Sequence, residues 1–225
     1  MRKVSFLPIL IFQLLLVIPV AASGYFAFAC SDLAGRFLFG EFVLLLATAL
    51  LFLVFLTVEY RLYLRIYPVK TGLLPRNSPE ELQYFVYLLF WLMFYIPLLR
   101  MSFIPAPLSR LVMIALGGRV GEGTYSSGIV FDAHFVTLGS HTQIGLDALL
   151  IPHSQAGGEL AHYPIQVGNN VTIGARSIIM AGVVIEDGAV IGAGSLVSLG
   201  THVQANEVWA GIPARPIKRA SQVDS

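Results

Sequence analysis

The stretch Val167–Ala214 decides the fold, and in units of six it reads VGNNVT IGARSI IMAGVV IEDGAV IGAGSL VSLGTH VQANEV WAGIPA. An aliphatic residue opens seven of these eight units, and Trp209 opens the last. A helix would repeat its apolar positions every 3.6 residues, so a period of six excludes one. The period predicts short strands separated by turns, stacked as a coil with the first residue of each unit pointing inward.

The same phase recurs earlier in the chain, at Leu138, Ile144 and Leu150. Looser units around Val120-Gly121 and Val130–Phe135 are expected to begin the coil. The segment His153–Ile165 is too polar and too rich in Gly to continue it, so a loop that protrudes from the coil is predicted. Small turn residues are expected to supply positive φ: Gly168, Asn169, Asn170, Gly174, Gly188, Gly192 and Gly194.

The composition shows that this coil is only half of the protein. The 225 residues are 56% hydrophobic and 12% charged, whereas soluble domains carry about 25% charged residues. Thirteen of the 15 Phe precede Ile104, and 17 of the 21 Gly follow Leu116. We therefore expect a helical membrane module at 1–116 and a β-coil domain at 117–225. The net charge of +1 argues against a strongly basic nucleic-acid binder, and the single Cys30 excludes an intramolecular disulfide framework.

Two uncharged runs in the first half are each predicted to cross a membrane. Val4–Ser31 exceeds the roughly 20 residues that a crossing helix needs. Phe42–Val58 is shorter, but the tyrosines that follow can lie at the interface. A signal peptide cleaved near Val20–Ser23 is the alternative for the first run. The apolar run continues through Tyr25–Ala29, which favours an uncleaved anchor.

Charge placement predicts the orientation of this helical hairpin. Four basic residues follow the second run: Arg61, Arg65, Lys70 and Arg76. The positive-inside rule therefore puts that segment, the amino terminus and the coil on the cytoplasmic side of an inner membrane. A third apolar run, Leu82–Leu99, has basic residues on both sides and many aromatic residues. We expect it to lie in, or re-enter from, the cytoplasmic interface rather than cross.

Three stretches of the second half resemble the hexapeptide-repeat acyltransferases, most of all the galactoside and maltose O-acetyltransferases. They are Pro164–Gly174, Ile191–Val197 and Ala210–Lys218, the last reading AGIPARPIK. The resemblance covers Val120–Lys218 and implies a left-handed parallel β-helix that uses acetyl-CoA and no metal. It also implies a homotrimer with active sites between neighbouring subunits. The soluble sugar enzymes have no counterpart of the hydrophobic first half.

Acetyl transfer to a hydroxyl requires a general base, and His suits that role near neutral pH. The resemblance places the catalytic base at His153, where the coil breaks into the protruding loop. His162, inside that loop, is the main rival, and it, Asp132 and His134 are candidate contacts for the acceptor. His141 and His202 stand at non-initial positions of their units and are expected to face solvent.

The resemblance also carries over residues for coenzyme A. Ala175 and Ala193 match positions whose backbone contacts the pantetheine arm, and Ser198 matches a cofactor-contacting Thr. Arg215 and Lys218 match a basic pair that faces the phosphates, a role that guanidinium and ammonium groups suit. On residue chemistry alone, a solvated basic tail is the alternative for this last pair.

These observations predict a membrane-anchored acetyl-CoA-dependent O-acetyltransferase that acts on a sugar, with a membrane- or lipid-linked glycan precursor as the expected acceptor. N-acyl transfer and transfer of a longer acyl chain are close variants. A non-catalytic trimeric scaffold for polysaccharide biosynthesis is the alternative from another class. A zinc carbonic anhydrase on the same coil would need His ligands where this chain has Ala175 and Met180, so we expect no zinc site.

Overall fold

A computed structural model describes residues 5–100 and 104–219, with side chains up to Ile217. The chain divides into two compact units. One holds residues up to Val69 together with Pro79–Leu92, and the other holds Lys70–Ser78 and the chain from Met93 onward. The predicted boundary after residue 116 differs from this division, because 70–78 and 93–116 group with the coil.

The helical unit contains α1 (Phe6–Leu15), α2 (Val17–Ala34), α3 (Gly40–Ile66) and α4 (Pro79–Phe90). A π-helical turn (Trp91–Tyr95) and α5 (Ile96–Arg100) continue the last of these into the other unit. Within the described residues, three helical stretches are long and apolar enough to span a membrane: Phe6–Ala34, Gly40–Ile66 and Pro79–Arg100. This supports membrane association, and the interfacial placement of 82–99 stays a prediction.

Aromatic rings hold α1, α3 and α4 together. Phe12 meets Phe90 edge to face at 5.0 Å between ring centroids, and Tyr60 lies 6.0 Å from both Tyr87 and Phe90. The Tyr63 hydroxyl donates to the Gln83 carbonyl at 3.0 Å. The aromatic residues of α4 therefore form the core of this unit.

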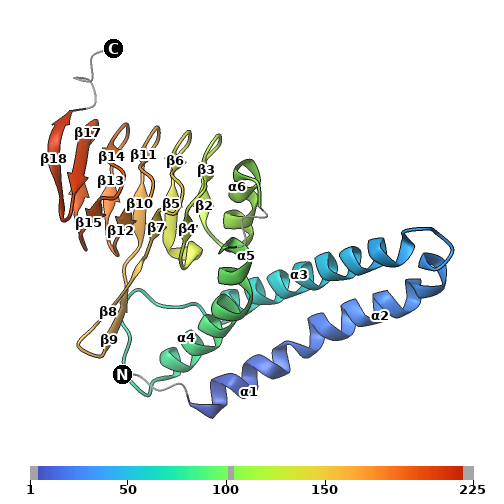
Figure 1. The fold of residues 1–225 in the computed structure, drawn as a ribbon. Coiled ribbons are helices and arrows are strands. Elements are labelled where there is room, and N and C mark those ends of the chain that lie inside the picture. Colours follow the sequence, from blue (N-terminus) through green and yellow to red (C-terminus); the bar gives the residue numbers. More distant parts are fainter. Residues whose placement is uncertain (1–4, 101–103, 220–225) are drawn as a thin grey trace. The chain divides into compact units, whose positions relative to one another are not determined.

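The second unit is a coil of short strands that stack into three parallel sheets (Figure 1). The first face holds β2 (Arg119–Val120), β5 (Val136–Leu138), β10 (Ile165–Val167), β13 (Val184–Ile185) and β16 (His202–Val203). The second holds β3 (Tyr125–Ser126), β6 (Gln143–Ile144), β11 (Thr172–Ile173), β14 (Val190–Ile191) and β17 (Glu207–Gly211). The third holds β4 (Ile129–Val130), β7 (Leu149–Leu150), β12 (Ile178–Ile179) and β15 (Leu196–Val197).

Strand register confirms the predicted period and the left-handed β-helix. Val167 pairs with Ile185, and Ile173 pairs with Ile191, so each turn of the coil takes 18 residues, or three units of six. The residues that open the units from 167 to 203 are at most 3% exposed. The aliphatic residues therefore fill the inside of the coil, as predicted.

The turn residues behave differently from one another. Asn170, Gly188 and Gly194 have the expected positive φ, but Gly168, Asn169, Gly174 and Gly192 do not, so that part of the prediction is wrong. A Cβ at Gly174 would lie 2.4 Å from the backbone nitrogen of Ala193 in the next turn of the coil. That Gly is therefore needed for the close approach of successive turns rather than for its dihedral angle.

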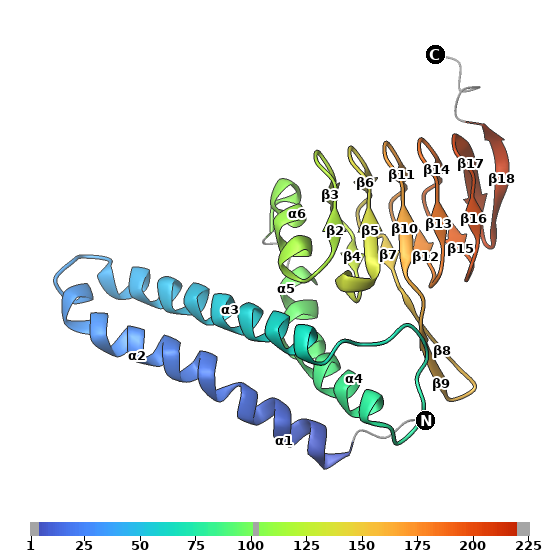
Figure 2. The ribbon, with the colours of Figure 1, turned by 180° about the vertical axis from the view of Figure 1, so that it is seen from behind.

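The predicted loop between β7 and β10 is a β-hairpin that projects from the coil (Figure 2). Its strands are β8 (His153–Ala156) and β9 (Glu159–His162), joined through Gly157 and Gly158, both of positive φ. A third strand, β1 (Gly72–Leu73), pairs antiparallel with β9. The polar, Gly-rich composition that ends the coil thus forms a small sheet of its own.

Both ends of the coil are covered. Helix α6 (Ala106–Ala115) packs on the first turn, where Arg110 Nε donates to the Gly121 carbonyl at 2.8 Å. At the other end, β18 (Ala214–Arg219) folds back antiparallel on β17. These caps protect the open edges that a stack of parallel strands would otherwise expose.

Candidate active site

The candidate site centres on a His–carboxylate pair at the base of the hairpin. His153 is the first residue of β8, and its Nδ1 is hydrogen-bonded to Oδ2 of Asp132. The Asp132 side chain is 3% exposed, whereas that of His153 is 30% exposed. A buried carboxylate thus holds an imidazole that solvent can reach.

Local backbone geometry positions the carboxylate. Asp132 adopts the left-handed conformation at φ 45° and begins a short 3₁₀ helix, Ala133–Phe135, between β4 and β5. Asp tolerates this conformation better than most residues, although it carries some strain. The turn directs the Asp132 side chain inward toward the residue that opens the hairpin one turn of the coil later.

The electrostatics of the pair make His153 a stronger base. Burial lowers the pKa of His153, but the hydrogen bond and negative charge of Asp132 outweigh burial and raise the pKa overall. With Nδ1 donating to the carboxylate, Nε2 of the neutral ring is the acceptor. The arrangement therefore leaves one nitrogen of His153 able to take a proton.

A wall of rings surrounds His153. Phe131 meets it edge to face at 6.0 Å, and the fully buried His162 does so at 6.3 Å. His162 also stacks on Phe135 at 5.1 Å. Burial is the largest cause that lowers the pKa of His162 to about 4, so this ring is neutral at physiological pH.

The segment that follows α3 pairs with β9, the hairpin strand that carries His162. Gly72 of β1 is registered with His162 and Leu73 with Ala161, and the Leu74 amide donates to the Leu160 carbonyl at 2.8 Å. Arg76 Nη2 donates to the Gly158 carbonyl at 2.8 Å. Sequence reasoning missed this strand, because two residues outside any periodic run carry no strand signal.

The structure brings Asp132 and His162 close to His153 but buries most polar atoms of the candidate acceptor residues, His134 included. Asp132 lies against His153, His162 is 0% exposed, and both ring nitrogens of His134 are buried. Their direct contact with an acceptor stays a prediction. His141 and His202 are exposed, as expected, and His202 Nε2 pairs with Glu186 at 2.7 Å.

The candidate coenzyme A residues lie along two edges of the third sheet. One edge is where its strands begin, and the other is where they end. Ala175 and Ala193 are exposed at equivalent turns before β12 and β15, and the Gly194 amide donates to the Ala175 carbonyl at 2.8 Å. Ser198 follows β15, so it lies at the opposite edge of that sheet. His153 follows β7 at this same edge, two turns of the coil earlier, or about 10 Å along the axis at the usual strand spacing.

The basic pair lies on the returning strand at the carboxyl end of the coil. Arg215 is exposed and pairs in register with Ala210, whose Cβ packs beside Gly192 in the turn that carries Ala193. This places the backbone of Arg215 beside the strand that packs on the turn carrying Ala193. Lys218 pairs with Val208 through the backbone, and its side chain lies outside the described residues.

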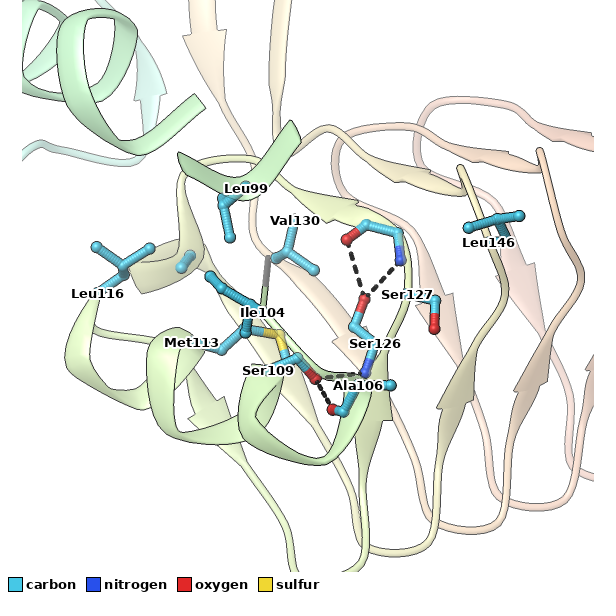
Figure 3. A pocket seen from close by; sticks show the side chains of 12 residues that line it. Leu99, Ile104, Ala106, Ser109, Met113, Leu116, Ser126, Ser127, Val130 and Leu146 are labelled. Carbon is cyan, nitrogen blue, oxygen red and sulfur yellow. Dashed lines mark hydrogen bonds between the residues drawn. The ribbon is translucent and has the colours of Figure 1, made fainter. Parts of the chain in front are cut away.

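A separate cavity of about 180 Å³ lies beneath α6 (Figure 3). Apolar side chains line most of it, including Ile104, Met113 and Val130. Ser109 Oγ accepts from the Ser126 amide at 2.8 Å and donates to the Ala106 carbonyl at 2.6 Å. The cavity reaches Ala133, next to Asp132 in the chain, but His153 does not line it.

The geometry suits proton abstraction by an oriented imidazole. Among the described residues, no group of three or more His, Cys, Asp or Glu side chains is arranged to hold a metal ion. Nε2 of His153 can accept a proton from a nucleophile, with Asp132 fixing the tautomer of the ring.

Comparison with known proteins identifies the repeat. Residues 164–198 match the family model for bacterial transferase hexapeptide (six repeats), which confirms the resemblance seen in the sequence. No significant relative was found among curated proteins.

Solved structures of hexapeptide acetyltransferases are also similar. A hexapeptide-repeat acetyltransferase of Vibrio cholerae is 26% identical, over 45% of this chain and 61% of that one, with a TM-score of 0.42. The same protein in complex with acetyl coenzyme A is 26% identical, over 46% of this chain and 60% of that one, with a TM-score of 0.43. A galactoside acetyltransferase in complex with coenzyme A is 21% identical over 73% and 80% of the two chains, with a TM-score of 0.40.

This chain thus spans about 60% of the length of the Vibrio structures. Because each TM-score lies below 0.5, these likenesses add nothing about the site residues, which rest on the geometry described above.

Proposed function

We propose that this chain, whose repeats match the bacterial transferase hexapeptide family, transfers an acetyl group from acetyl-CoA to a hydroxyl of a sugar. The observation that carries the proposal is the pair of His153 and Asp132 at the break in the coil. A half-exposed imidazole held by a buried carboxylate is a general base in the form that acyl transfer needs.

In the proposed reaction, Nε2 of His153 takes the proton of the acceptor hydroxyl as its oxygen attacks the thioester carbonyl. Collapse of the tetrahedral intermediate breaks the carbon–sulfur bond, and the imidazolium returns the proton to the leaving thiolate. Asp132 stabilises that imidazolium and keeps Nδ1 protonated throughout. The products are an acetyl ester and free coenzyme A.

We assign the coenzyme A site to the edges of the third sheet. Exposed backbone at Ala175 and Ala193 would hold the pantetheine arm, and Ser198 would contact the cofactor at the edge that also carries His153. Arg215 and Lys218 would face the phosphates, with charge-assisted hydrogen bonds. These assignments rest on the resemblance and on the placement of the residues in the coil.

The acceptor and the assembly are part of the same proposal. Three apolar helical stretches favour an acceptor, or a partner enzyme, at the membrane, and we propose a membrane- or lipid-linked glycan precursor. Basic residues after α3 favour a cytoplasmic location of the coil, where acetyl-CoA is available. Exposed Ile212 on the coil fits assembly with further copies, and we propose a homotrimer.

Coenzyme A release tests the reaction. The full-length protein in lipid nanodiscs is incubated with acetyl-CoA and a panel of free sugars, amino sugars and polyprenyl-linked sugars, and the thiol released is titrated. We expect release with at least one sugar and an acetylated product that mild base hydrolyses, because an ester is labile where an amide is not. A base-stable product would move the assignment to N-acyl transfer.

The chain offers a matched control for the base. His153→Ala should lower the rate by about 10²- to 10⁴-fold, the usual contribution of a positioned base. His202→Ala removes another His–carboxylate pair, exposed on the coil, and should leave the rate unchanged. Full coenzyme A release by folded His153→Ala protein would refute the mechanism, and no release with any acceptor would favour the scaffold.

A further inference from the structure

Helix α6 has two faces of different character. Its inner face packs on the first turn of the coil: Met113 is 5% exposed, and Ser109 is bonded to Ser126. Its outer face exposes Leu108 at 49%, Leu111 at 59% and Ile114 at 39%. At about 100° per residue, these residues share an arc of roughly 120° with Pro107 and Ala115. We call this arc the α6 stripe; every residue on it is apolar.

The surroundings of the α6 stripe are basic. Arg100 precedes the helix and Arg119 follows it, and both are exposed. Arg110 lies at the margin of the stripe, where it is bonded to the Gly121 carbonyl. The sequence from 100 to 122 contains three Arg and one acidic residue, the exposed Glu122. An apolar strip bordered by cations is the pattern of a helix that lies in the interface of an anionic membrane.

The chain connection keeps the α6 stripe near the apolar stretch that we expect to lie in, or re-enter from, the cytoplasmic interface. The stretch Pro79–Arg100 is long and apolar enough to cross a bilayer, and α6 begins at Ala106. The five residues between them reach at most about 21 Å when fully extended. The start of α6 therefore stays within about 21 Å of the end of that stretch.

We propose that the α6 stripe lies on the inner surface of the membrane, with Leu108 and Leu111 in the acyl boundary and the arginines among anionic headgroups. A second copy of the chain is a poorer occupant, because a symmetric contact would bring together three Arg but only one nearby acidic residue, Glu122, from each copy. Lipid satisfies both the apolar arc and the charges. The contact would also fix the end of the coil nearest the cavity of Figure 3 against the bilayer surface.

Lipid quenching tests this placement without reference to catalysis, so it stands or falls independently of the proposed function. Cys30→Ser removes the single native thiol, and Leu111→Cys or Leu108→Cys then carries an environment-sensitive fluorophore in the full-length protein. Leu199→Cys is the matched control, since Leu199 is also apolar and 49% exposed but lies on the fourth turn of the coil. The protein is reconstituted in vesicles of phosphatidylcholine with and without phosphatidylglycerol, using brominated acyl chains as quencher.

We expect both α6 labels to be quenched severalfold more than the Leu199→Cys label, and more strongly when phosphatidylglycerol is present. Using two outward positions guards against a variant that fails to fold. Equal quenching at α6 and at Leu199→Cys would overturn the proposal. So would disulfide cross-linking of Leu111→Cys between copies without lipid quenching, because the stripe would then contact a second copy.

Discussion

The regular coil from Ile165 to Val203 and the hairpin interruption from Pro152 to Tyr163 bury different kinds of side chain. Inside the coil are aliphatic residues, with small residues such as Ser177, whose hydroxyl donates to the Gly174 carbonyl at 2.7 Å within its own turn. At the interruption, the buried carboxylate of Asp132 holds the partly exposed His153, and a second imidazole, His162, is fully buried.

The difference shows where this fold makes room for chemistry. The regular coil has 18 residues per turn, and its inward positions are apolar or small. A hairpin inserted between two turns adds a second layer beside the coil, and polar groups can be buried there with partners. The four predictions below test this contrast.

The largest effect is expected from a cavity in the regular coil. Ile179 on β12 is 0% exposed, and Ile179→Ala should lower the free energy of unfolding by about 2–5 kcal/mol. Thr172→Ala, on the exposed face of β11, should change it by less than about 0.5 kcal/mol. Thermal or denaturant unfolding measures both. A pH-dependent effect of Ile179→Ala would break the contrast, since this site contains no ionisable group.

At the interruption, stability should depend on pH through His162. Its pKa is lowered to about 4 in the folded protein, so below about pH 6.5 the unfolded chain binds a proton that the folded chain does not. Stability should therefore decrease as pH falls from 6.5 toward 4, by at most about 3 kcal/mol from this group. The slope of unfolding free energy against pH should be smaller in His162→Phe than in the wild-type protein, and this variant keeps the stacking on Phe135. An unchanged slope would contradict the assignment.

Asp132→Asn should lower the rate of acetyl transfer by about 10²-fold, because the imidazolium loses its counter-charge. The acid limb of the pH–rate profile should also move. Asp132 raises the pKa of His153 against burial, so its removal lowers that pKa and shifts the limb to lower pH. A rate loss without this shift would indicate that Asp132 acts only through folding.

The smallest effect concerns the strand that supports the hairpin. Arg76→Ala removes one exposed hydrogen bond to the Gly158 carbonyl, with an expected cost of about 1 kcal/mol or less. We expect faster amide hydrogen exchange in β8 and β9 but not in β12. Exchange that increases equally in both regions would show that the hairpin is not an independent element. Arg61→Ala, outside the coil unit, is the control.

Sequence patterns predicted much of this architecture and part of the site. The six-residue period placed the inward residues of each strand, and the end of that period located His153 where the coil breaks. Asp132, the partner of His153, was expected to contact the acceptor instead. A left-handed Asp before a 3₁₀ turn does not follow the six-residue period, so the period did not indicate this pairing. The strand at Gly72–Leu73 and the coil-capping position of α6 were also outside what the patterns indicated.

The sequence by itself determined the coil, because each unit of six meets the same neighbours one turn above and below, and its local pattern therefore specifies its environment. The tertiary structure alone decided which groups meet at the interruption. Asp132 and His153 are 21 residues apart, and Arg76 and Gly158 are 82 apart. No repeat relates such positions. The first contact depends on where the β8–β9 hairpin leaves the coil, and the second depends on the pairing of β1 with β9.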